Sequence, residues 1–170
     1  MDKILKIAAF KINVLEKYLL PVALLAARLH LGMVFWASGL TKLPLGSATG
    51  LFESEYIPAW EKNHVKDILG LHIPFPVPSA AFGAYSATII EIGCSVLLML
   101  GLGGRFAAFM LGMMALTVEL FVYPGESDHL HWMLLAAILV TAGPGAISVD
   151  HFIRRKLLKS RLYDRTVDIH

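Results

Sequence analysis

The chain has 170 residues, of which 56% are hydrophobic and 16% charged, and its formal net charge is +2 at pH 7. Soluble domains carry about 25% charged residues, so this composition excludes an ordinary soluble domain and indicates a single compact integral membrane domain. No Lys/Arg cluster interleaved with aromatic residues lies outside the segments expected near lipid, so we expect no nucleic-acid partner. Cys94 is the sole cysteine, which excludes an internal disulfide and a CxxC redox pair.

The N-terminal segment combines an interfacial helix with a first membrane span. Residues 1–18 are predicted to form a basic amphipathic helix in the plane of the lipid headgroups. Residues 19–43, LLPVALLAARLHLGMVFWASGLTKL, exceed the ~20 apolar residues that a span requires. Arg28 lies well inside this span, where a guanidinium costs about 2.5–3.5 kcal/mol on insertion scales. We therefore expect Arg28 to have a partner within the membrane.

The rest of the chain reads as an outer loop, three further spans and a tail. Residues 44–79 are predicted as a periplasmic loop with one or two short interfacial helices, bounded by a proline-rich stretch. The spans are expected over residues 80–100, 106–123 and 130–147, with the last helix ending near Ala142 before a GPG break. Residues 151–170 form a basic tail that we expect to bind anionic lipid headgroups. The predicted fold is an all-α four-transmembrane-helix bundle.

Lysine and arginine are distributed unevenly between the two sides of this bundle. The loops and tails on one side hold eleven of them, against three on the other, namely Lys42, Lys62 and Lys66. Positive charge is enriched on the cytoplasmic side of membrane proteins. The sequence therefore predicts that both termini are cytoplasmic.

Depth along the helices suggests a partner for Arg28. Arg28 lies nine residues from the inner end of its span, about 13 Å deep, and Glu91 lies eleven residues from the outer end of the second span, about 16 Å from that face. In a core about 30 Å thick the two levels nearly coincide. We therefore predict an Arg28–Glu91 ion pair, either as a structural lock or as a site that handles protons or substrate.

Further polar side chains are expected in the outer half of the bundle. Helical spacing gathers Lys42, Glu119, His129 and His131 there, above Arg28 and Glu91, as a polar funnel open to the outside. Glu119 and His131 are the candidate proton relay, because an acid and a histidine at similar depth suit general acid–base exchange.

A metal site at these histidines is the weaker interpretation. His129 and His131 are two residues apart at a helix start, so they point in different directions, and a third ligand would have to come from His64 or His72. We expect no metal.

The motifs together resemble those of a known family. They are an intramembrane Arg in span one, GLTK at its end, Glu in span two, GLGGR after it, a His opening span four and GPGAISVD closing it. This combination, over residues 24–150, resembles the DoxX family of small four-span bacterial membrane proteins. The resemblance implies a bundle in the inner membrane. It also implies links to quinone-coupled oxidation of sulfur compounds, to oxidative-stress complexes or to operons for modified peptides.

Two functions follow as hypotheses. The first is a quinone- or redox-linked membrane subunit of a partner oxidoreductase. Its site would be lined by Arg28, Glu91, Lys42, Glu119 and His131. Whether the subunit itself is an enzyme is left open. In that case quinone is the expected exchangeable cofactor, and none is expected to be tightly bound. The alternative is a non-catalytic membrane partner or transport component of a peptide- or metal-related pathway. Membrane lipid and an operon-encoded protein are the expected partners, and a homo-oligomer is an open alternative.

Overall fold

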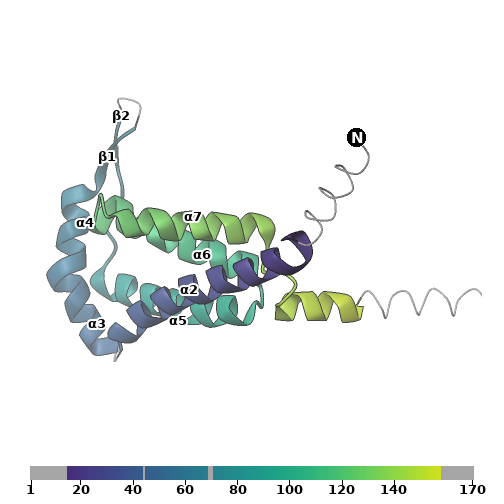
Figure 1. Ribbon diagram of the computed structural model, residues 1–170. Coiled ribbons are helices and arrows are strands. Elements are labelled where there is room, and N and C mark those ends of the chain that lie inside the picture. The colour runs from purple at the N-terminus through teal and green to yellow at the C-terminus, as the bar shows by residue number, and fades with distance from the viewer. Residues whose placement is uncertain (1–14, 44, 69–70, 158–170) are drawn as a thin grey trace, which may run out of the picture.

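The computed structural model is a bundle of long helices that lie side by side (Figure 1). It describes residues 15–43, 45–68 and 71–157. Helix α2 follows the π-helical segment η1 (Leu15–Leu19), and α6 continues into the π-helical segment η3 (Val118–Val122). The four long helices are α2 (Leu20–Thr41), α5 (Ala80–Leu100), α6 (Gly104–Thr117) and α7 (Ser127–Ala142).

Three helical stretches in the described part of the chain are long and apolar enough to cross a membrane. They are Lys17–Thr41, Ala80–Leu100 and Gly104–Val122, which agrees with the first three predicted spans. Helix α7 has 16 residues, or about 24 Å, and ends at Gly143, whose φ of 84° favours glycine. It lies alongside α6 (Figure 1), and its crossing of the membrane stays a prediction.

Helices α2 and α5 pack closely through two glycines of α2, Gly32 and Gly39. A Cβ added at Gly32 would lie 2.6 Å from Met99 Cγ, and one added at Gly39 would lie 2.7 Å from Ile92 Cγ1. The glycines are seven residues apart, as are the residues that they face, so these contacts fix one antiparallel register. Small residues allow the same close approach of helices in other membrane bundles.

The segment between α2 and α5 folds over one end of the bundle, which we call the hairpin end (Figure 1). The expected short helices are confirmed there, but two strands also form, so the chain is not entirely helical. Val65 pairs with Pro74 and Ile68 with Leu71; strands this short leave little pattern in a sequence. The elements are α3 (Leu45–Leu51), η2 (Phe52–Tyr56), α4 (Ile57–Asn63), β1 (Val65–Ile68) and β2 (Leu71–Pro74).

The opposite end, which we call the tail end, carries the turn between α5 and α6 and the chain after α7. Residues 149–157 are helical, so the predicted tail begins as a helix. The Asp150 carboxylate accepts hydrogen bonds from the N–H groups of Gly103 and Gly104, at 2.9 and 3.1 Å. Most of the predicted amphipathic segment 1–18, and residues 158–170 of the tail, lie outside the described residues.

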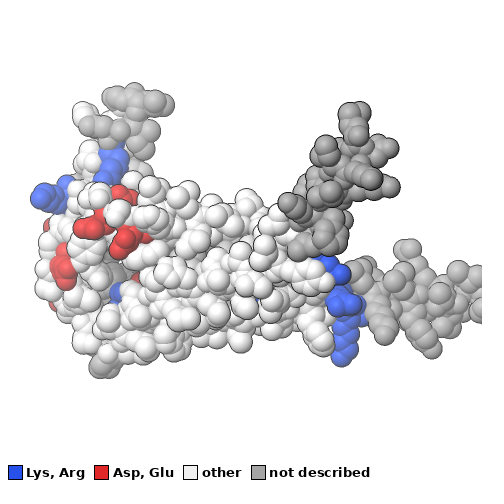
Figure 2. Space-filling view, viewed as in Figure 1, with Lys and Arg blue, Asp and Glu red and all other residues white. Residues whose placement is uncertain are grey.

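Charged side chains gather at the two ends of the bundle, and the visible face between them is uncharged (Figure 2). The blue patch at the tail end includes the exposed residues Arg154, Arg155 and Lys156. An apolar band bounded by charged ends is the surface that a bilayer requires.

Candidate functional site

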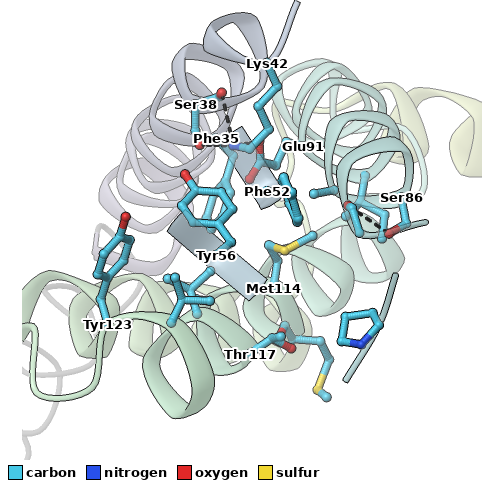
Figure 3. Close-up of a pocket in the computed structure, with 18 of the residues that line it drawn as sticks. Phe35, Ser38, Lys42, Phe52, Tyr56, Ser86, Glu91, Met114, Thr117 and Tyr123 are labelled. Carbon is cyan, nitrogen blue, oxygen red and sulfur yellow. Dashed lines mark hydrogen bonds and ion pairs between the residues drawn. The ribbon is translucent and has the colours of Figure 1, made fainter. Parts of the chain in front are cut away.

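A cavity of about 430 Å³ lies in the half of the bundle nearest the hairpin end. One buried apolar cluster, around Leu31, Leu98 and Leu111, fills the bundle beneath it, and a second, around Phe52 and Ala84, belongs to the hairpin end. Figure 3 shows the cavity between the helices of the bundle. Its lining is mainly apolar, and its polar side chains are Ser38, Lys42, Tyr56, Trp60, Ser86, Glu91, Thr117, Tyr123 and His129.

An ion pair forms one wall of the cavity. Lys42, which caps the C-terminus of α2, places its Nζ 2.7 Å from Glu91 Oε2 on α5. Nζ also donates to Ser38 Oγ at 2.9 Å and to the Ser38 carbonyl at 3.2 Å (Figure 3). Lys42 and Glu91 are only 3% and 4% exposed. A charge pair kept this far from water needs such added hydrogen bonds to offset its desolvation.

The structure corrects the predicted Arg28–Glu91 pair. Glu91 faces Gly39, eleven residues beyond Arg28, so about 16 Å of helix separates the two levels. Arg28 is 1% exposed and lies at the tail end. Its Nη2 donates to the Ile147 carbonyl, and Gly101 packs directly on its guanidinium. The depth estimate failed because α2 and η1 extend past α5 at the tail end (Figure 1).

Arg28 therefore lies outside the cavity, in a cluster at the tail end with Gly101, Ile147 and Asp150, which we call the lock. Its Nε and Nη1 have no hydrogen-bond partner among the described residues. Asp150 is the acidic residue whose charge acts on it, while the Asp150 carboxylate oxygens accept the amides that begin α6. The neighbours of Arg28 are thus a carbonyl and a nearby carboxylate in place of Glu91.

His129 is the histidine that meets Glu119. His129 Nδ1 lies 2.9 Å from Glu119 Oε2, and the Gly125 N–H donates to Glu119 Oε1 at 2.8 Å. His129 is buried and lines the cavity, whereas Glu119 is partly exposed. His131 Nδ1 instead lies 2.8 Å from the Ser127 carbonyl, and His131 lines a separate groove between α2 and α7. The predicted pairing of Glu119 with His131 is thus corrected to His129, which lies two residues earlier in the HxH motif.

Aromatic side chains of the outer loop cover the cavity at the hairpin end, where an open funnel was predicted. The Phe52 and Tyr56 rings meet edge to face at 4.7 Å, and Tyr56 meets Tyr123 at 6.1 Å. The Tyr123 hydroxyl donates to Glu55. Burial, reinforced by the neighbouring carboxylates, raises the pKa of both phenols, so they remain neutral donors at physiological pH.

Trp60 contributes a further donor to this cover. Its ring stacks on Phe121 with centroids 4.4 Å apart, and it lines the cavity. Its buried Nε1–H has no hydrogen-bond partner within the described ranges. A buried unpaired donor costs about 1–3 kcal/mol, so an acceptor that reached this N–H would relieve that cost.

Sequence reasoning missed Ser38, Tyr56 and Trp60 as site residues. Phe52, Tyr56 and Trp60 recur at four-residue intervals, a pattern that predicted interfacial helices but not the surface that they cover. As for metal, His64 lies at the end of α4 with its ring against the Glu61 carbonyl. The portion of the chain that the structure describes holds no cluster of three or more His, Cys, Asp or Glu side chains suited to a metal.

Fold and site together define a multi-pass helical membrane protein with a covered, mainly apolar cavity beside a buried ion pair. The family model for DoxX matches residues 23–124, which run from α2 to just past η3. The chain therefore belongs to the DoxX family. No match was found among curated proteins or among solved structures.

Proposed function

We propose that this protein is a membrane subunit that binds a quinone in the cavity and exchanges electrons with a partner oxidoreductase. The observation that carries the proposal is a cavity of about 430 Å³ that is lined mainly by apolar side chains and by a few buried donors. Small-molecule sites have volumes of about 300–1,000 Å³ and pair apolar linings with a few polar groups. Quinones match this chemistry, because two carbonyl oxygens sit on an otherwise apolar ring.

The donors that would hold such a ring come from two elements, the C-terminal end of α2 and helix α4. The unpaired Trp60 N–H is one. The Lys42 ammonium, whose three N–H groups contact Glu91 and Ser38, becomes another when an incoming oxygen replaces the Ser38 carbonyl, its longest contact. Both can donate to carbonyl oxygens, and hydrogen bonds from a charged donor are worth about 1.5–3 kcal/mol. The residues present therefore fit the proposed cofactor.

A bound quinone would supply a reversible step of two electrons and two protons. The redox centre of the partner protein takes up or supplies the electrons. We assign the proton path to His129 and Glu119, because His129 lines the cavity and Glu119 is reached from water. An imidazole paired with a carboxylate can accept a proton on one side and release it on the other.

The proposed placement is the bacterial inner membrane, with α7 as the fourth span and both termini in the cytoplasm. The basic residues of the tail end, which include Arg154 and Arg155 (Figure 2), support this orientation through the positive-inside rule. The hairpin end then faces the periplasm, as do the carboxylates of Glu53, Glu55 and Glu61. An exchange site near that face suits an extracytoplasmic or membrane-bound redox partner.

Binding can be tested with Trp60 as the reporter. Trp36→Phe with Trp132→Phe leaves Trp60 as the sole tryptophan. In reconstituted vesicles, a benzoquinone with a decyl tail should quench its fluorescence saturably. Lys42→Met should weaken binding at least tenfold, while the exposed control Lys62→Met should leave it unchanged.

A cavity-filling variant separates binding from folding. Ala87 is buried and lines the cavity, so Ala87→Leu fills space without removing a charge and should also abolish saturable quenching. Quenching that does not saturate, or that is equal in all variants, would contradict the quinone site. It would favour the alternative of a non-catalytic membrane partner or transport component.

A further inference from the structure

We infer that the occupant of this cavity is an amphiphile dissolved in the bilayer, which enters sideways between α5 and α6. Its polar head lies toward Lys42–Glu91, and its tail leaves through this gap into the lipid. The inference rests on the proposed function only for the identity of the head. It adds the route and the requirement for a tail.

The first support is that α5 and α6, which a turn joins at the tail end, both border the cavity toward the hairpin end. The turn at residues 101–103 connects them, and beside it Ala107 and Ala108 on α6 and Leu98 on α5 are completely buried. Toward the hairpin end, both helices instead line the cavity. Further along, Met114 of α6 packs against the buried cluster that contains Ala84 and Ala87 of α5, and the cavity lies beside this contact.

The second support is that residues bordering the cavity on these helices are also exposed on the lateral surface. Phe82 on α5 is 68% exposed and Met113 on α6 is 43% exposed, and both line the cavity. By contrast, Lys42 and Glu91 on its other wall are almost completely buried. Figure 3 places Thr117 across the cavity from Lys42, and Ser86 on the neighbouring helix. We call Phe82, Ser86, Met113 and Thr117 the rim.

The third support is the depth of the rim within the membrane. Ser86 lies six residues from the start of α5, and Thr117 lies five residues before the end of η3, so both are about 8–9 Å inside the helix ends. Spans of this length match a hydrocarbon core about 30 Å thick. The rim therefore faces acyl chains rather than water.

The rim is also chemically suited to an acyl or isoprenoid tail. Ser86 donates its hydroxyl to the Phe82 carbonyl at 2.7 Å, and Thr117 donates to the Met113 carbonyl at 2.8 Å. Both hydroxyls are thus satisfied within their own helices, which leaves an apolar edge with flexible methionine beside it. At the hairpin end, by contrast, the aromatic cover and the Tyr123–Glu55 hydrogen bond lie over the cavity.

The experiment measures association and dissociation rates of the decyl-tailed benzoquinone by stopped-flow quenching of Trp60 in vesicles. Ser86→Phe with Thr117→Phe narrows the rim and should slow both rates at least tenfold, with little change in their ratio. The matched control is Ile89→Phe with Leu120→Phe, exposed residues of α5 and η3 that do not line the cavity. It should leave both rates within twofold of the parent. Unchanged rates in the rim variant would overturn lateral entry.

Two further measurements test the route when the narrowed variant does not fold or the benzoquinone does not bind. Phe82→Ala widens the rim and should raise both rates, so the route is testable even when the narrowed variant does not fold. When the benzoquinone fails to quench Trp60 at all, the quinone proposal fails. Stearic acid carrying a mid-chain nitroxide then tests the route alone, with the same rim and control variants. Failure of both probes to quench Trp60 would overturn the inference.

Discussion

Breaking the Lys42–Glu91 pair should destabilise the protein more by removing one partner than by removing both. At 2.7 Å and an effective dielectric constant of about 20, the attraction is about 6 kcal/mol, most of it offset by desolvation of two buried charges. Removing one partner of such a pair typically costs about 3–5 kcal/mol, because the other charge is left buried without a counter-ion.

The two single substitutions should differ. After Glu91→Leu, the Lys42 ammonium keeps both Ser38 hydrogen bonds, so we expect a loss near 3 kcal/mol. Lys42→Met leaves the Glu91 carboxylate without its ammonium donor, and the loss should be closer to 5 kcal/mol. The double variant Lys42→Met with Glu91→Leu replaces both charges by apolar groups of similar size. It should lie within about 2 kcal/mol of the parent.

The assay is equilibrium unfolding in mixed micelles of increasing dodecyl sulfate fraction, followed by far-UV circular dichroism. Glu61→Leu with Lys62→Met, an exposed pair of charges on α4, serves as the control and should show additive, small effects. A double variant at positions 42 and 91 whose loss equals the sum of the two single losses would refute the coupling argued here.

Three further outcomes test other parts of the fold. Gly39→Ala should cost about 1–3 kcal/mol by overpacking, because its Cβ would lie 2.7 Å from Ile92 Cγ1; Ile92→Ala should restore part of that loss in the same unfolding assay. Asp150→Ala should lower the melting temperature measured by circular dichroism, since it removes two amide hydrogen bonds, whereas a surface effect alone would leave it unchanged. The pKa of Tyr123 is raised above its usual value of 10.0 by burial and by Glu55, so its contribution to stability is complete below pH 10 and is lost as pH rises through the folded-state pKa. Between pH 8 and pH 11 the parent should therefore lose more stability than Tyr123→Phe, and equal losses would argue against this assignment.

The helices and their approximate bounds could be predicted from hydropathy and from residues such as Gly143, because these signals are local. The close approach at Gly32 and Gly39 was likewise predictable, since small residues on one helical face have few other uses in a bundle. Which charged residues pair with one another could not be predicted. It depends on how far α2 extends past α5, and a sequence gives lengths of apolar segments without their relative heights.

The residues of the cavity also fall into those that the sequence predicts and those that it does not. Helical spacing predicted Lys42 and His129 in the outer half and Glu91 below them. Their neighbours Tyr56 and Trp60 come from the loop, and the way a loop folds back depends on contacts between residues distant in the chain. The prediction named His131 instead of His129 because α7 begins at Ser127, three residues earlier than predicted.

The lock around Arg28 has a consequence for how the protein is made. Arg28 and its acceptor, the carbonyl of Ile147, are 119 residues apart. At about 5–20 residues per second, ribosomal synthesis of that interval takes about 6–24 s. During this time the first helix must hold an arginine whose final acceptor does not yet exist. We therefore expect the newly inserted helix to sit with Arg28 drawn toward the headgroups, and to settle to its final depth only when the last segment of the chain arrives.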